Sequence, residues 1–233
     1  MDGTTEVKYS YKLKQIKDFS QKVKNAPIHH FDAYIIYECW YPAIIRYPLS
    51  LISFTSKQCN NLQSQAIDSL LPKMGLNRKM PRVVIYGPMS LGGQEIMDLR
   101  IEQVACQWET TQGYLCQEDR ARVGLQLTLN DHQCIIGSDT LVLNLNPEKY
   151  DYGVKNSQWK YQWKSFWESR LSAEFYNAWL PRRNRTDDIN LMDRAIAILD
   201  SILTDSKWPL LEHINRCRLY LDVIYISELS KDE

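Results

Sequence analysis

Two adjacent aspartates, Asp187 and Asp188, come nearest to a catalytic pattern in this chain. Two-metal polymerases use a pair of aspartates on a tight hairpin between hydrophobic strands to bind Mg²⁺. Here the segment Arg183-Asn184-Arg185 lies just upstream of the pair, and a helical pattern begins directly after it. The sequence therefore favours helix-start carboxylates beside basic residues over a metal-binding pair.

The other reactive residue types also lack a complete catalytic pattern. The chain contains no GxSxG, HExxH or phosphate-loop motif. Its six cysteines are scattered without a CxxC pair, which is typical of small buried apolar residues. A zinc site formed by Cys134, His132 and a distant partner stays open as the alternative. His29-His30 lies ahead of a predicted helix and fits a surface or capping role.

Basic residues are more informative than these groups. Between Lys73 and Arg82 the sequence has no acid, and its basic residues are Lys73, Arg78, Lys79 and Arg82. Two further clusters are Arg182, Arg183 and Arg185, and then Arg216 and Arg218. Such clusters neutralise phosphates without reading bases, although a solvated surface explains each of them equally well. The lysines of the first segment, from Lys8 to Lys24, fit either interpretation.

The overall composition excludes several classes of protein. Lys+Arg and Asp+Glu both total 28, and this balance argues against a uniformly basic nucleic-acid binder. No apolar run reaches the roughly 18 residues of a membrane span, and the N-terminal segment is polar, unlike a secretory signal. We expect an intracellular protein, nuclear or cytoplasmic, with reduced cysteines and no membrane association.

Apolar spacing predicts that helices position most of these residues. Residues 9–25 have apolar side chains at helical spacing with lysines between them, which indicates an amphipathic helix. Residues 31–49 are apolar nearly all round, so they predict a buried helix. Pro42 is expected either to kink this helix or to divide it in two.

Turn and capping residues mark the next two helices. Thr55 and Gln58 form a capping box for a helix that ends at Gly75. Gly92-Gly93 supplies flexible backbone ahead of another helix, for which Asp98 is the expected N-cap.

The pattern beyond residue 110 is weaker. Segments 123–129 and 140–146 alternate like strands, although the first equally continues a helix. Trp159, Trp163 and Trp167 recur every four residues along one helical face, a pattern that usually belongs to the core. Further helices are expected over 189–203 and from 210 onward, so the chain is predicted to be mainly helical.

Several short motifs follow one another in a distinctive order along the chain. They are Tyr47-Pro48-Leu49, the helix with Cys59 and Gln63, Leu71-Pro72-Lys73-Met74-Gly75, the basic segment from Asn77 to Arg82, Gly87-Pro88, Gly92-Gly93, Glu102-Gln103, AWLPRR and INRCRLYLDVIYISEL. Together they resemble the region after the polymerase palm in retroelement reverse transcriptases, in particular the reverse-transcriptase-like proteins of diatom and other algal genomes. The resemblance is strong over 47–103 and 214–229. One departure is Gln94-Glu95, where related elements place a small or apolar residue after the glycines.

The resemblance implies an architecture as well as a parent enzyme. Residues 1–96 are expected to form a thumb-like helical bundle, and residues 97–233 a second helical segment with a few short strands. The catalytic palm would lie upstream of Met1, so Mg²⁺ is expected only for that missing part and no cofactor for this chain. The chain would then be a fragment of a retrotransposon RNA-directed DNA polymerase without its catalytic centre.

Two functions from different classes follow from these observations. A reverse-transcriptase thumb holds the template–primer duplex by its backbone, so the fragment is expected to bind an RNA–DNA hybrid or another duplex without sequence preference. The expected contacts are Lys73, Arg78, Lys79, Arg82, Arg182, Arg183 and Arg185. The alternative is a structural interaction domain that binds a protein partner, but no nucleic acid, at the Trp159, Trp163 and Trp167 face.

Overall fold

The computed structural model describes residues 5–138, 140–150, 152, 158–173, 187–202 and 207–229. The chain forms two compact units, Met1–Thr111 (unit 1) and Gln112–Glu233 (unit 2). The predicted boundary after residue 96 precedes this division. The described residues are mainly helical, as expected, and their sole strand-like pairing is an antiparallel bridge between Asn190 and Tyr225.

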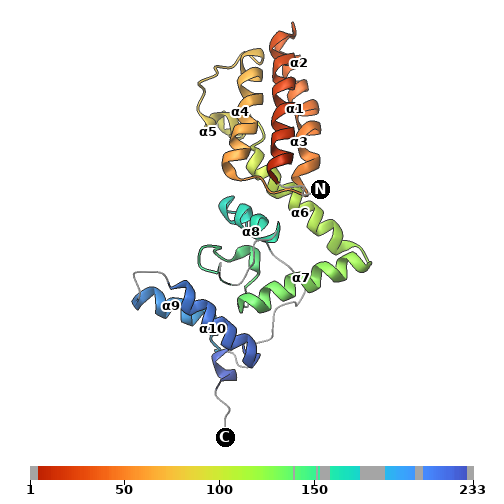
Figure 1. Cartoon of the computed structure of the whole chain (residues 1–233). Coiled ribbons are helices and arrows are strands. Elements are labelled where there is room, and N and C mark those ends of the chain that lie inside the picture. Colours follow the sequence, from red (N-terminus) through yellow and green to blue (C-terminus); the bar gives the residue numbers. More distant parts are fainter. Residues whose placement is uncertain are drawn as a thin grey trace. The chain divides into compact units, whose positions relative to one another are not determined.

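Unit 1 begins with an amphipathic helix, which confirms the pattern of residues 9–25. Helix α1 (Thr5–Asn25) packs along α4 (Ser56–Lys73), and its buried face contains Ile16, Phe19 and Val23 (Figure 1). Burial of these side chains, with about 25 cal/mol gained per Å² of apolar surface, drives the packing. Tyr9 and Leu13 are partly buried beside this face, and most of the lysines lie on the exposed side of the helix.

One continuous helical run connects α1 to α4, and it contains an unusual turn. It consists of α2 (His30–Ile35), a π-helix (Ile36–Trp40) and α3 (Tyr41–Leu49). Pro42 lies in the first turn of α3, where its missing N–H is tolerated. The run is therefore neither divided nor ended at this proline.

The π-helix explains an unusual spacing of buried residues. Ala33, Tyr37, Tyr41, Ile45 and Leu49 are all buried and lie four residues apart. In an ideal α-helix a four-residue step overshoots one turn by about 40°, so this series would leave the core within a few steps. The wider π turn takes up part of the overshoot and keeps the series on one face.

The expectation that residues 31–49 are buried all round is wrong. Only the face just described is buried, whereas Phe31, Ile35, Trp40 and Tyr47 are 60–80% exposed. The reason is packing: the core of unit 1 covers the face of the four-residue series, whereas Trp40 lines an open groove beside α1. Composition alone does not indicate how many neighbours a helix has.

Two glycines after α4 allow the chain to make a close backbone contact. Following α5 (Arg82–Tyr86) and a 3₁₀ turn (Met89–Leu91), Gly92 adopts a left-handed conformation with φ of 78°. A Cβ atom on Gly93 would lie 2.0 Å from the carbonyl oxygen of Gly87. Glycine is thus required at each position for a different reason: a positive φ at Gly92 and a close backbone crossing at Gly93.

Helix α6 (Leu99–Cys116) starts as predicted but buries an unexpected set of residues. The Asp98 carboxylate accepts a hydrogen bond from the Arg100 N–H at 2.9 Å, which is the expected capping contact. The apolar Ile101 is 52% exposed. The buried face instead includes Gln103 and Gln107.

Buried glutamines in unit 1 bind the backbone of neighbouring loops. The Gln103 side chain accepts from the Phe54 N–H at 2.7 Å and donates to the Phe54 carbonyl at 3.1 Å. Gln63 likewise accepts from the Leu99 N–H at 3.0 Å and donates to the Met97 carbonyl. These amides replace the pairing that a neighbouring strand would supply, so the loops lie inside the unit without orphaned polar groups.

Unit 2 is helical where strands were expected. Residues 123–129 lie inside α7 (Arg120–Ile136), and residues 142–144 form a 3₁₀ turn (Val142–Asn144). The helical alternative for residues 123–129 is therefore confirmed, whereas the strand prediction for residues 140–146 is wrong. A strand needs a partner, whereas α7 has its own start and stop signals: Asp119 accepts from the N–H groups of Ala121 and Arg122, and Gly137 ends the helix at φ of 74°.

The described remainder of unit 2 consists of three helices and a short 3₁₀ turn. The helices are α8 (Gln158–Glu168), α9 (Leu191–Ile202) and α10 (Trp208–Leu221), and the turn spans Ile226–Glu228. Helices α9 and α10 share a small core formed by Met192, Ile196, Leu199 and Leu211. The helical prediction from residue 210 onward is confirmed.

Candidate nucleic-acid interface

A rigid turn presents the basic segment between Lys73 and Arg82. At the end of α4 the Leu76 N–H donates to the Leu71 carbonyl at 2.8 Å and the Gly75 N–H donates to the Pro72 carbonyl at 3.2 Å. This pair of bonds, with Gly75 at φ of 77°, is a Schellman motif. It satisfies helix-end carbonyls and fixes the direction in which the chain leaves α4.

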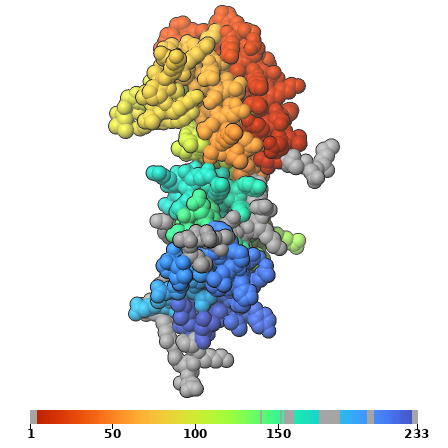
Figure 2. Space-filling view, turned by 60° about the vertical axis from the view of Figure 1, so that its left-hand side comes forward, coloured from red at the N-terminus to blue at the C-terminus, as the bar shows by residue number. Residues whose placement is uncertain are grey.

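The next turn presents two basic side chains to solvent. Asn77 accepts the Lys79 N–H on its side chain at 2.8 Å and the Met80 N–H on its carbonyl at 3.0 Å. Arg78 and Lys79 at this turn are both exposed. Within the described ranges, neither side chain forms an ion pair with a carboxylate. Figure 2 shows the chain from the end of α4 through α5, coloured yellow, protruding on one side of unit 1.

The two outer members of the basic segment are anchored to the helices. The ammonium of Lys73 donates to the Ala26 carbonyl at 2.8 Å, which links the end of α4 to the α1–α2 turn. The guanidinium of Arg82 donates to the Ser64 hydroxyl at 3.3 Å. Because Ser64 and Lys73 are nine residues apart on α4, the two anchors lie about 14 Å apart along that helix. Nine residues are also two and a half helical turns, so Ser64 and Lys73 lie on opposite sides of α4 and the two anchors do not share one face.

The other basic clusters contribute differently. Arg182, Arg183 and Arg185 lie outside the described residues. Arg216 forms an exposed ion pair with Glu212, one helical turn away. Arg218 is 3% exposed, and its guanidinium donates to the Ile135 carbonyl at 2.9 Å and to the Cys134 carbonyl. A phosphate-binding role for Arg218 is therefore wrong, because its donors hold the end of α7.

The tryptophan stripe of α8 is partly core. Trp163 is buried at 1% exposure and donates its indole N–H to the Leu145 carbonyl at 2.8 Å. Trp167 is 41% exposed, and Trp159 is intermediate. Trp163 thus packs within unit 2 and does not present its ring on an open face. A protein partner at this stripe stays a prediction for Trp159 and Trp167.

The acid pair does not form a metal centre with its neighbours. The Asp188 carboxylate accepts from the Ser227 hydroxyl at 2.5 Å and from the Ser227 N–H at 3.2 Å, so it joins the start of α9 to the C-terminal segment. Asn190 caps α9 by accepting from the Met192 and Asp193 N–H groups. Across the described part of the chain, no three His, Cys, Asp or Glu residues are grouped closely enough to hold a metal ion. Among these residues, Cys134 and His132, the alternative zinc ligands, therefore have no third ligand beside them.

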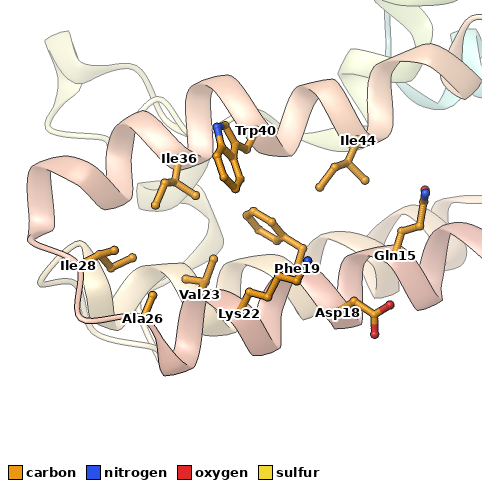
Figure 3. Close-up of a pocket in the computed structure, with 10 residues that line it drawn as sticks. All are labelled: Gln15, Asp18, Phe19, Lys22, Val23, Ala26, Ile28, Ile36, Trp40 and Ile44. Atoms are coloured by element: carbon orange, nitrogen blue, oxygen red, sulfur yellow. The ribbon is translucent and has the colours of Figure 1, made fainter.

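An apolar groove of about 510 Å³ lies between α1 and the α2–α3 run (Figure 3). Trp40, Ile36 and Ile44 point into it from one side, and Phe19 points into it from α1. Its charged residues are Asp18 and Lys22, both on α1. This lining has no nucleophile beside a base, so it offers no reaction chemistry.

Three aromatic rings near the basic segment were not predicted as functional. His29, His30 and Phe31 are consecutive and exposed, with ring centroids 4.0 Å apart for the two histidines and 4.3 Å apart for His30 and Phe31. The sequence signal was available, since three ring residues in a row lie at the start of α2. His29-His30 was interpreted as surface or capping material, and Phe31 as part of a buried helix.

Comparisons of the chain with family models, with curated proteins and with solved structures gave no match. Among the described helices, none is both long enough and apolar enough to cross a bilayer.

Proposed function

We propose that this chain binds nucleic-acid backbones weakly and without sequence preference, as the duplex-holding part of a reverse transcriptase. The contacts are the basic segment Lys73–Arg82. The observation that supports this proposal most directly is the turn at Asn77, which holds Arg78 and Lys79 exposed and, in the described part of the chain, without carboxylate partners.

Phosphate binding suits these side chains for a physical reason. Arg78 has a planar fork of donors that matches two phosphate oxygens, and Lys79 supplies a compact charge beside it. Neither must first give up an ion pair with an acid. The backbone turn is fixed by Asn77 and by the Schellman motif, so little conformational entropy is lost when a strand binds.

Affinity for an RNA–DNA hybrid, measured by fluorescence anisotropy over a series of salt concentrations, tests the proposal. We expect binding at low salt that weakens steeply as salt rises, with equal affinities for unrelated sequences. Replacing Arg78→Glu together with Lys79→Glu removes two phosphate contacts. This change should lower the slope of log K against log salt by about 1.8 for a duplex and weaken binding at every salt concentration.

A charge-matched control keeps the test specific. Arg120→Glu with Arg122→Glu changes the net charge of the chain by the same amount, in the first turn of α7, where acidic residues are favourable. This control should bind the hybrid nearly as the unmodified chain does. If the unmodified chain shows no binding at low salt, or if both double variants bind alike, the proposal is refuted and the interaction-domain alternative gains.

A further inference from the structure

The exposed rings of His29, His30 and Phe31 form a cluster at one end of unit 1. The His29 and Phe31 planes are inclined by only 24° with centroids 5.8 Å apart, so the rings lie nearly parallel. Phe31 is 68% exposed, although phenylalanine is among the residues most often buried. We call these three residues the ring cluster.

The backbone below the ring cluster is held in place. The Ala33 N–H donates to the His29 carbonyl at 3.1 Å, and the His29 N–H donates to the Asp32 carboxylate at 3.3 Å. Asp32 is the one acid within this cap, and its carboxylate is already used by that bond. The rings therefore project from a fixed helix start, as a stacking surface requires.

Lys73 of the basic segment lies at the same end of the unit as the ring cluster. Lys73 binds the Ala26 carbonyl, and Ala26 is three residues from His29, so the ammonium lies within about 14 Å of the backbone at His29. Figure 1 shows the end of α4 and the start of α2 at this same end of unit 1. The exposed Lys24, in the last turn of α1, adds a further charge.

We propose that the ring cluster stacks against an unpaired base of a single-stranded nucleic acid whose phosphates bind the basic segment. Exposed aromatic faces beside a cationic track are the two components that sequence-tolerant single-strand binders combine. At 3.4 Å per stacked nucleotide, the distance between ring cluster and Lys73 corresponds to about four nucleotides, so one short strand reaches both. This inference rests on the proposed backbone binding and names the form of nucleic acid that the site prefers.

Paired bases are stacked on their neighbours and present only their edges in the grooves. A ring cluster on a protruding helix start therefore meets a base face only in a single strand or at an unpaired end. We expect tighter binding to a single-stranded oligothymidylate than to a blunt duplex of the same length.

The test compares an oligothymidylate with an abasic oligomer of the same length, which has the same phosphates and no bases. Phe31→Ala should weaken oligothymidylate binding about 5-fold or more and leave abasic binding unchanged. Phe31→Trp should restore the affinity. Tyr47→Ala is the matched control, because Tyr47 is an 80% exposed ring about 24 Å away along the same helical run. It should change neither affinity.

The salt dependence separates this inference from the proposed function. Phe31→Ala removes no charge, so its slope of log K against log salt should equal that of the unmodified chain, whereas Arg78→Glu with Lys79→Glu lowers the slope. If Phe31→Ala binds oligothymidylate normally, or loses as much affinity for the abasic oligomer, stacking is refuted while backbone binding stands. If neither oligomer binds at low salt, both proposals fail.

Discussion

Replacing Arg218 with methionine should open the end of α7 in unit 2. Methionine matches the length of arginine but has no donors, so the substitution removes the bonds to Asn215 at 3.0 Å, to the Val223 carbonyl at 3.2 Å, and to the Cys134 and Ile135 carbonyls. Two of these acceptors belong to the last turn of α7, where no N–H of the helix itself reaches them. No other side chain in the described segments takes their place.

The size of the effect follows from competing terms. Charged hydrogen bonds of this kind contribute about 1.5–3 kcal/mol each, but they are not additive, and some carbonyls regain water when the arginine is gone. Burial also opposes the cation, and accordingly it lowers the pKa of Arg218. The substitution leaves neutral acceptors behind and no unpaired charge. Each buried acceptor left without a donor costs about 1–3 kcal/mol, and we expect a total loss of about 3 kcal/mol.

Hydrogen exchange on the full chain measures this loss locally. Peptides from α7 and α10 should exchange faster by a factor of about 10² or more, while peptides from α4 in unit 1 serve as the internal reference. Arg216→Met is the control, since Arg216 lies two residues away and forms only an exposed pair with Glu212. It should cost about 0.5 kcal/mol or less. Equal exchange in the two variants would show that burial of the Arg218 cation cancels its bonds, and the reasoning would be wrong.

Two further predictions concern unit 1. Gly93→Ala places a methyl group against the Gly87 carbonyl and should lower the free energy of unfolding in urea by about 3 kcal/mol or more. Gly92→Ala meets no atom within 4 Å and should lower it by only about 1–2 kcal/mol, because of the positive φ. Similar losses in the two variants would refute the backbone crossing. Burial raises the pKa of the Cys59 thiol to about 12, and the nearby Asp98 carboxylate adds to the shift. Iodoacetamide near neutral pH should therefore alkylate the exposed Cys39 and Cys217 of the native protein but not Cys59. The unfolded chain releases the Cys59 thiol proton at lower pH than the folded chain, so the free energy of unfolding should fall as pH rises from about 9 toward 12. Rapid labelling of Cys59 in the native protein would contradict both the protection from alkylation and this pH dependence.

Sequence patterns predicted the elements that depend on local signals. The Thr55–Gln58 capping box, the stop at Gly75 and the cap at Asp98 are all present in the structure. Each needs only residues within one or two helical turns, so a single sequence contains the whole signal. The same holds for α7, where the cap at Asp119 and the stop at Gly137 are local signals that favour the helical alternative for residues 123–129.

Features that depend on distant partners could not be predicted in this way. Gln103 is polar and would be placed at the surface, yet it lies inside unit 1 because the Phe54 backbone, 49 residues away, needs both a donor and an acceptor. Arg218 is of a residue type that often binds phosphate, yet its donors bind the carbonyls at the end of α7. For the candidate interface, the sequence located Arg78 and Lys79 but not the proximity of Lys73 to the α1–α2 turn, which depends on how α1 and α4 pack.

The π turn over Ile36–Trp40 has a consequence for how this chain tolerates changes in length. Removing one residue from it would let an ordinary α-helix form, but every side chain after it would rotate by about 100° about the helix axis. Tyr41, Ile45 and Leu49 would then swing away from α4, and neighbours such as Trp40 would turn inward in their place. A shortening that looks harmless to the helix would thus turn the buried series out of the core, so unit 1 depends on keeping this one extra residue.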